Sequence, residues 1–297
     1  MPSVYWAYNT SGTGDNCSTC AVLTSPVLSS DGTQMAFVGS SSTGSFLYIL
    51  KPKAGEGTVG APAQPTTQTT TASTYVTCRN LTGAGATSCL LSLPLGLAAS
   101  VTSDTNSSPF CDYTNDVIYV GDDKGVLYKY TGIFQGTPTR VVNSFYPRPV
   151  HNGTVLTGPV YDQTSGNIYV GDSGGLLSYL RETGSTVGTC TAGNPPCFGS
   201  TTLNAGRNRP ILDTPIVDST TQQVLVFVGS DNGRTNAAVY QTPTSLASSV
   251  EAAVGPIFTN NFYAGAFDNA YYNSVASGHL YTCGNKLLAG NVQVVGL

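Results

Sequence analysis

One pattern recurs five times along the chain and restricts it to few folds. Each copy has a short apolar run, a polar turn and a second apolar run that ends in glycine, such as AFVG, IYVG or VFVG. β-Branched and aromatic residues favour strands, and Asp-Gly or Gly-Gly turns favour tight hairpins. A third strand-like run follows each copy. The five copies occupy residues 25–40, 108–122, 158–172, 214–230 and 267–284.

Repeated units of three or four antiparallel strands are typical of a β-propeller. We therefore expect an all-β fold, a β-propeller of four-stranded antiparallel blades. The third strands are predicted at 45–50, 125–130, 175–180, 236–241 and 291–296, and the fourth at 89–95, 139–145, 201–206 and 249–255.

The first residues bear on how such a ring closes. VYWAYN at 4–9 has the composition of a strand and could complete the last blade, which would remove the sheet edges. The ring would then have five blades. A fragment of a six- to eight-bladed ring would show the same repeats.

We predict a single β-propeller domain over 1–297, because no linker separates two cores. No long stretch has helical periodicity. The segment at about 51–88 is rich in Pro, Thr and Gly, which predicts a loop insertion rather than a further domain.

The charge balance and the length of the apolar runs exclude two classes of protein. Lys and Arg number 12 against 16 Asp and Glu, and only 9% of residues are charged. A protein that binds nucleic acid by neutralising phosphates needs a basic face, so no nucleic-acid partner is expected. No apolar run reaches the roughly 18 residues of a membrane helix, so no membrane span is expected.

Eight cysteines in a weakly charged chain indicate an oxidising compartment. Disulfides are favoured over reduced thiols or a metal site, because histidine is scarce and the spacings are irregular. Cys111 and Cys283 fall in predicted strands and are interpreted as buried thiols. The disulfide candidates are three local pairs: Cys17 with Cys20, Cys78 with Cys89, and Cys190 with Cys197.

These features predict an extracellular or periplasmic protein. No signal peptide is visible, so we expect that a leader was removed or that the chain is a fragment.

A set of motif residues in the first repeat carries a family resemblance. They are Trp6, Tyr8, Ser25, Pro26, Val27, Val38, Gly39 and Ser40. Their pattern resembles the repeats of PQQ-like (quinoprotein-type) propellers. The stretches at 171–190 and 267–274 are similar to those of uncharacterised secreted propeller proteins of acidobacteria.

The resemblance implies a propeller and no particular activity. Quinone-dependent dehydrogenases use adjacent cysteines, a stacking tryptophan and an acidic calcium site. Here Cys17 and Cys20 are separated by two residues, and the one tryptophan lies in a strand motif. We therefore expect no cofactor and no metal.

Aspartates recur in register within the repeats. Asp122, Asp172 and Asp231 occupy the turn after the second run, where an aspartate bonds its own backbone. Asp112, Asp162 and Asp218 follow the first run. Catalysis seldom needs the same group in every blade, so the recurrence favours structural roles over calcium binding or catalysis.

Ligand-binding candidates lie in the connections between repeats. Arginines there could bind a carboxylate or phosphate, or they could anchor loops. Tyrosines and an aspartate could stack on and bond to sugar rings, or they could pack between blades. The candidates are Arg148, His151, Arg207, Arg209, Tyr263, Asp268, Tyr271 and Tyr272.

The sequence favours a non-catalytic extracellular binding or scaffold propeller, whose ligand is a glycan or an envelope protein. One alternative is an enzyme, a degenerate quinoprotein or a propeller hydrolase or lyase, using Asp268, His151 and Arg209. The other alternative is a structural component of a larger surface protein. No catalytic constellation is assigned, and the oligomeric state is open.

Overall fold

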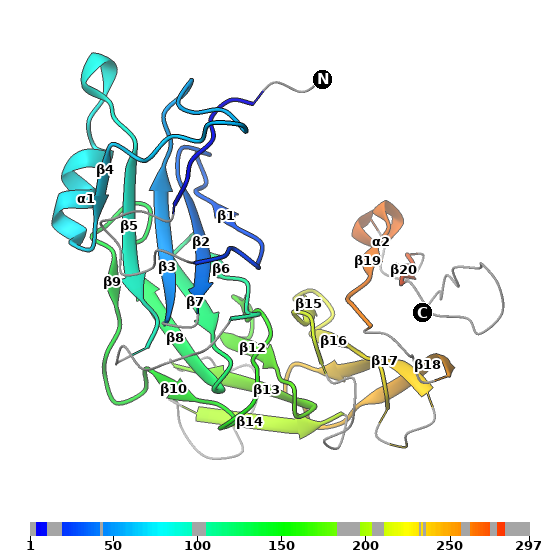
Figure 1. Cartoon of the computed structure of the whole chain (residues 1–297). Coiled ribbons are helices and arrows are strands. Elements are labelled where there is room, and N and C mark those ends of the chain that lie inside the picture. Colours follow the sequence, from blue (N-terminus) through cyan, green and yellow to red (C-terminus); the bar gives the residue numbers. More distant parts are fainter. Residues whose placement is uncertain are drawn as a thin grey trace. The chain divides into compact units, whose positions relative to one another are not determined.

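The repeats fold into sheets that fall into two compact units, Met1–Pro149 and Val150–Leu297 (Figure 1). Each unit is described by itself, and the single domain over 1–297 stays a prediction. The computed structural model describes residues 4–10, 20–41, 44–96, 105–182, 197–203, 211–231, 233, 236–256, 262–273 and 278–282.

The first unit holds two sheets. The first sheet has the order β1-β2-β3-β5-β4, antiparallel except for the β4–β5 pair. Its strands are β1 (Val27–Leu28), β2 (Met35–Ser41), β3 (Gly44–Lys51), β4 (Thr67–Thr69) and β5 (Cys89–Pro94). In the second sheet, two short strands share the place of a fourth strand beside β8. Its strands are β6 (Phe110–Asp112), β7 (Val117–Gly121), β8 (Val126–Thr131), β9 (Thr139–Arg140) and β10 (Arg148–Pro149).

The second unit holds two four-stranded antiparallel sheets and a short strand pair. The third sheet is β11 (Val160–Asp162), β12 (Asn167–Gly171), β13 (Leu176–Arg181) and β14 (Cys197–Thr202). The fourth is β15 (Ile216–Asp218), β16 (Gln223–Val228), β17 (Asn236–Pro243) and β18 (Val250–Pro256). The fifth repeat forms β19 (Ala266–Phe267), helix α2 (Asn269–Asn273) and β20 (Leu280–Tyr281).

The chain is thus all-β, with the four-stranded antiparallel blades of a β-propeller, as the repeats predict. The number of blades stays a prediction, and the strand expected at 291–296 lies outside the described residues. The second strands β7 and β12 are buried along their whole length, which fits sheets stacked face to face. The last residue of β12, Gly171, has to be a glycine. A Cβ there would overlap the side chain of Ile211, which leads into the next repeat.

The loop expected at 51–88 is more regular than its composition suggests. It contains β4, helix α1 (Ala72–Arg79) and the short 3-10 helix η1 (Gly83–Gly85). Helix α1 has no apolar stripe, so periodicity did not reveal it. Burial of Tyr75, Cys78 and Arg79 holds it in place, and such tertiary packing supplies most helical stability in proteins.

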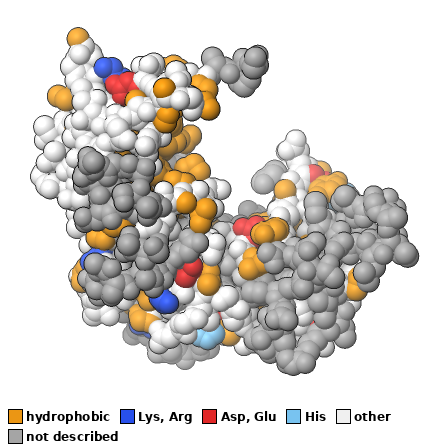
Figure 2. Space-filling model, in the orientation of Figure 1, with side chains coloured by type: hydrophobic (Ala, Val, Ile, Leu, Met, Phe, Trp, Pro, Cys, Tyr) orange, Lys and Arg blue, Asp and Glu red, His pale blue; other side chains and the backbone are white. Residues whose placement is uncertain are grey.

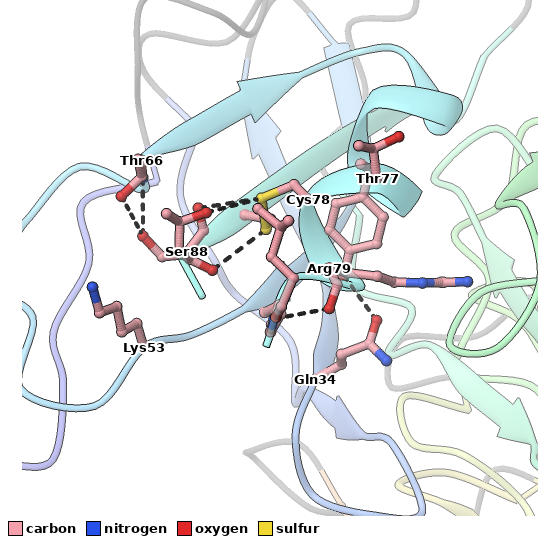
Figure 3. Close-up of a disulfide and its surroundings, with 12 residues drawn as sticks. Gln34, Lys53, Thr66, Thr77, Cys78, Arg79 and Ser88 are labelled. Atoms are coloured by element: carbon pink, nitrogen blue, oxygen red, sulfur yellow. Dashed lines mark hydrogen bonds between the residues drawn. A yellow bond between two sulfur atoms is a disulfide. The ribbon is translucent and has the colours of Figure 1, made fainter. Parts of the chain in front are cut away.

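The cysteines follow the sequence where the structure describes them. Cys78 and Cys89 form a disulfide that ties α1 to β5, which confirms one predicted pair (Figure 3). Cys20 is also disulfide-bonded. Cys111 is a free, buried thiol, as expected. The remaining predicted partners Cys17 and Cys190, the side chain of Cys197, and Cys283 lie outside the description.

Helix α1 also joins the first sheet to the second. The Arg79 guanidinium donates to the carbonyls of Ile133 (3.2 Å), Gln135 (2.8 Å) and Gly136. The Gln34 amide donates to the Phe134 carbonyl at 2.9 Å. Each carbonyl of the 133–136 turn therefore accepts a bond from the first sheet or its helix.

The amides of the same turn have their own acceptor. The Asp116 carboxylate accepts from the backbone N–H groups of Phe134, Gln135 and Gly136 at 2.8–3.0 Å. On the helix side, the Tyr75 hydroxyl donates to the Gln34 side-chain carbonyl at 2.9 Å (Figure 3). We call this network, made by Gln34, Tyr75, Arg79 and Asp116, the turn lock.

The second unit joins its sheets in a similar way. The buried Arg181 donates to the Asn167 side-chain carbonyl at 2.8 Å. The Asn167 amide and the Tyr169 hydroxyl then both donate to the Thr244 carbonyl, in the connection between β17 and β18. A buried arginine therefore supports the contact between sheets here too.

The N-terminal strand-like run has a partner within the first unit. Residues 4–10 bond to the 55–63 segment, with the Ala7 and Ala63 amides donating to the Glu56 and Ala7 carbonyls at 2.9 Å. Trp6 and Tyr8 pack against the face of the first sheet that carries Phe37 and Tyr48. The closure of the last blade by this run stays a prediction, because the strand expected at 291–296 lies outside the described residues.

No helix in the described ranges is long and apolar enough to cross a membrane.

Replacing Arg79 with methionine should cost about 2–4 kcal/mol of unfolding free energy, because three turn carbonyls lose their donor. Urea unfolding of R79M measures the loss. Lys124→Met, at an exposed lysine, is the control and should change the free energy little. Equal stability of the two variants would contradict the turn lock.

Cys78→Ser with Cys89→Ser should lower the unfolding free energy by about 2–3 kcal/mol, from the loop entropy of the 11-residue separation. Reduced wild-type protein should match the double variant in urea unfolding. A reduced protein as stable as the oxidised one would show that packing alone holds α1.

Candidate functional site

The predicted binding residues fall in three places. Arg148 lies on β10 of the first unit, with its guanidinium 5.3 Å from the centre of the Phe145 ring. His151 is the second residue of the second unit. Tyr263 lies just before the fifth repeat, and Asp268 and Tyr271 lie within it, where the structure brings the two together. Arg207, Arg209 and the side chain of Tyr272 lie outside the described residues.

Asp268 makes several of the contacts within the fifth repeat. It precedes α2, and its Oδ1 accepts from the Tyr271 amide at 2.9 Å, the bond of a helix N-cap. Its backbone pairs with His279, since the Asp268 amide donates to the His279 carbonyl at 3.1 Å. The stretch FDNAYYN, expected in a connection between repeats, therefore forms a short helix after Asp268.

The second carboxylate oxygen of Asp268 faces two aromatic side chains. Oδ2 lies 3.0 Å from His279 Nδ1 and accepts from the Tyr281 hydroxyl at 3.4 Å. The His279 side chain is 54% exposed, and Tyr281 is 43% exposed. We call Asp268, His279 and Tyr281 the aromatic–carboxylate cluster.

His279 and Tyr281 were not among the predicted site residues. The sequence GHLYT does contain a signal for them, because alternate residues of a strand share one face. Leu280, between them, is 1% exposed and packs with Phe227 and Phe262 in the core. A buried leucine between two exposed aromatic residues is the pattern that could have revealed the cluster.

Tyr271 connects α2 to the fourth sheet. Its ring stacks on Phe267 with centroids 3.8 Å apart, and its hydroxyl donates to the Asp218 carboxylate. Asp218 also accepts from the amides of Thr220 and Thr221 in its own turn. Tyr271 therefore supports the cluster from behind rather than forming part of its exposed surface.

Both carboxylates of this region are held in the charged form. The backbone bond from Tyr271 lowers the pKa of Asp268, with a further contribution from His279. Burial would raise the pKa of Asp218, but bonds from Thr221 and Tyr271 outweigh it and lower the pKa. The cluster therefore presents a negative charge beside aromatic rings at neutral pH.

His151 belongs to a separate contact. Its Nδ1 lies 2.6 Å from Oδ2 of the buried Asp172, whose Oδ1 accepts from the amides of Gly174 and Leu176. In the second sheet, Asp122 holds its turn in the same way and its second oxygen accepts from the Tyr128 hydroxyl at 2.9 Å. His151 thus occupies the place of a structural partner of a turn aspartate.

The aspartates after the first run also hold turns, as predicted. Asp112 and Asp162 accept from backbone amides two and three residues on. Asp162 in addition accepts from the Ser219 hydroxyl of the next repeat. Among the described residues, no group of three or more His, Cys, Asp or Glu could hold a metal ion.

Tyr271→Phe should cost about 1–2 kcal/mol at neutral pH, because it removes the bond to the Asp218 carboxylate but keeps the ring on Phe267. Because the pKa of Asp218 is lower in the folded protein than its ordinary value of 3.8, the charged carboxylate stabilises the fold above pH 3.8. This stabilisation is lost as the pH falls through the folded pKa. The stability gap between wild type and Y271F should therefore narrow in acid below that value. Urea unfolding across pH measures the gap, and a constant gap would contradict the assignment.

Comparison with known proteins finds similar solved structures but no family. No family model matches the chain, and no curated protein matches it. Ninety-two chains of solved structures match. One is the β-propeller domain of Cps50 (Swd1) from Myceliophteria thermophila, with 10% identity and a TM-score of 0.43. The match covers 85% of this chain and 63% of that one, so this chain spans less than two thirds of the solved chain.

Proposed function

We propose that this chain is a non-catalytic, extracellular binding or scaffold propeller, and that the aromatic–carboxylate cluster binds a glycan. The observation that carries the proposal is the exposed pair His279 and Tyr281 on the carboxylate of Asp268. A third exposed aromatic residue, Tyr263 at 57%, lies just before that repeat in the sequence.

The chemistry of the cluster suits a sugar. Aromatic rings offer an apolar face to the C–H face of a pyranose, and the polar atoms at their edges bond to hydroxyl groups. A carboxylate oxygen accepts from sugar hydroxyls. Small-molecule sites combine a mainly apolar lining with a few placed polar groups, and exposed aromatic patches mark interaction sites.

The contacts favour binding over catalysis. The enzyme hypothesis needs Asp268 and His151 to converge on one substrate. Instead Asp268 contacts His279, and His151 contacts Asp172. Asp268 and Asp172 are each in contact with a nearby imidazole and accept hydrogen bonds from backbone amides close in sequence. This is the pattern of a structural or binding carboxylate.

The chain's setting supports an extracellular role. The Cys78–Cys89 disulfide fits an oxidising compartment. The propeller blades fit the resemblance to PQQ-like repeat proteins. An envelope protein is the other partner class that the sequence suggested, and the glycan is preferred because the cluster is small and polar at its edges.

The purified chain should bind at least one member of a broad glycan and polysaccharide panel, and Tyr281→Ala should weaken that binding at least about tenfold. Isothermal titration calorimetry on the hit measures both affinities.

Tyr5→Ala is the matched control, since Tyr5 is 71% exposed in the first unit and far along the chain from the cluster. Y5A should bind like wild type. Equal loss in both variants, or no glycan bound by the wild type, would overturn the proposed function.

A further inference from the structure

The charge around the aromatic–carboxylate cluster has one sign. Asp213 Oδ2 accepts from the Ala264 amide at 3.1 Å, and the Asp218 carboxylate accepts from the Tyr271 hydroxyl. In the view of Figure 2, acidic and hydrophobic side chains appear together over the part of the second unit that holds α2. The described residues 262–273 and 278–282 contain no Lys or Arg. The charge that this segment presents is therefore negative.

The sequence extends this imbalance over two repeats. Residues 211–282 contain five Asp and Glu residues and one Arg. Like charges repel and opposite charges attract, so such a region favours a cationic ligand over an anionic one.

Asp268 holds its charge at the surface of the cluster. Its side chain is 23% exposed, and the bond from the Tyr271 amide, followed by those from His279, keeps its pKa below the ordinary value. Its partners in the part of the chain that the structure describes are two backbone amides, the His279 imidazole and the Tyr281 hydroxyl. The imidazole supplies a positive charge only when it is protonated. The other partners donate hydrogen bonds without a counter-charge.

One of these contacts is long. The Tyr281 hydroxyl lies 3.4 Å from Asp268 Oδ2, whereas O–H···O bonds usually measure about 2.7–2.8 Å. A stronger donor can replace this hydroxyl and leave the backbone bonds to Oδ1 in place. An ammonium group is such a donor, because charge-assisted bonds are about twice as strong as neutral ones. A sugar hydroxyl is a neutral donor like Tyr281 and has no such advantage.

The two exposed rings suit a cation as well. The ring centroids of His279 and Tyr281 lie 6.1 Å apart, and the planes are tilted by 56°. The face of a tyrosine ring attracts an ammonium group that lies within about 6 Å of its centre. An amino sugar combines an ammonium group with a pyranose ring whose C–H face packs on an aromatic ring.

We propose that the aromatic–carboxylate cluster selects glycans that carry free amino groups, such as glucosamine oligosaccharides, and that Asp268 binds their ammonium group. The inference rests on the proposed glycan site and names its ligand class. Acetylation removes the positive charge of an amine, so N-acetylated sugars are weaker ligands. Sulfated and uronic-acid glycans are disfavoured because they bring a like charge to Asp268.

The test compares a glucosamine oligosaccharide with an N-acetylglucosamine oligosaccharide of the same length, by isothermal titration calorimetry at neutral pH and low salt. Wild type should bind the first at least about tenfold more tightly. Asp268→Asn should remove this preference, and α2 should keep its N-cap because asparagine caps helices as well as aspartate does. Circular dichroism of D268N checks that the variant is folded.

The matched control is Glu251→Gln, which removes one negative charge from an exposed position of β18 in the same unit. A glutamine there still accepts from the Tyr240 hydroxyl, as Glu251 does at 2.8 Å. E251Q should therefore keep the preference for the amino sugar.

A second measurement needs no variant. Added sodium chloride should narrow the preference of the wild type for the amino sugar, because salt screens exposed charges. The affinity for the N-acetylated oligosaccharide should change little. A preference that does not depend on salt would contradict selection by charge.

The outcomes separate this inference from the proposed function. Loss of the preference in D268N, but not in E251Q, supports the inference. A preference that survives in D268N, or that is lost equally in E251Q, overturns the assignment to Asp268. A neutral glycan bound as tightly as the amino sugar overturns the ligand class and leaves the glycan site standing. A wild type that binds no glycan overturns both.

Discussion

The turn at 133–136 sets a main constraint on the first unit, because Ile133 and Phe134 are buried there and the turn bonds to the first sheet and its helix. Buried N–H and C=O groups must find partners or cost free energy. Asp116 accepts from the amides, and Arg79 with Gln34 donates to the carbonyls. This requirement explains why a segment without helical pattern forms α1. The helix is the support that carries Arg79 across to the second sheet, and the disulfide fixes its last turn.

The repeated aspartates meet a related requirement at the turns, and their variation creates the candidate site. In three of them, one carboxylate oxygen accepts from the turn amides and the other contacts a side chain that differs from one aspartate to the next. The partner is Tyr128 for Asp122, His151 for Asp172 and Tyr271 for Asp218. The last bond lies next to the carboxylate cap of α2, so the fifth repeat uses structural turn chemistry to hold its exposed aromatic residues.

The sequence predicted what is periodic and missed what depends on single contacts. Strands such as Val117–Gly121 and Asn167–Gly171 were predictable because their turns and apolar runs repeat. The Cys78–Cys89 pair was predictable from its short spacing. Helix α2 was not, because it depends on single contacts such as the Asp268 cap rather than on a repeated pattern. The partner of the first strand was not predictable either, since any apolar sheet face could have received Trp6.

The low charge of the chain connects its fold to its recognition surfaces. Only 9% of residues are charged, and several of them make contacts inside the fold. Arg79 and Arg140 donate to backbone carbonyls, and Arg181 donates to the buried side-chain oxygen of Asn167. Charges used in this way are not available on the surface to steer or hold a partner. Aromatic faces and single placed carboxylates then remain as the surface chemistry by which a partner could be held. The proposed site at Asp268 is a surface of this kind.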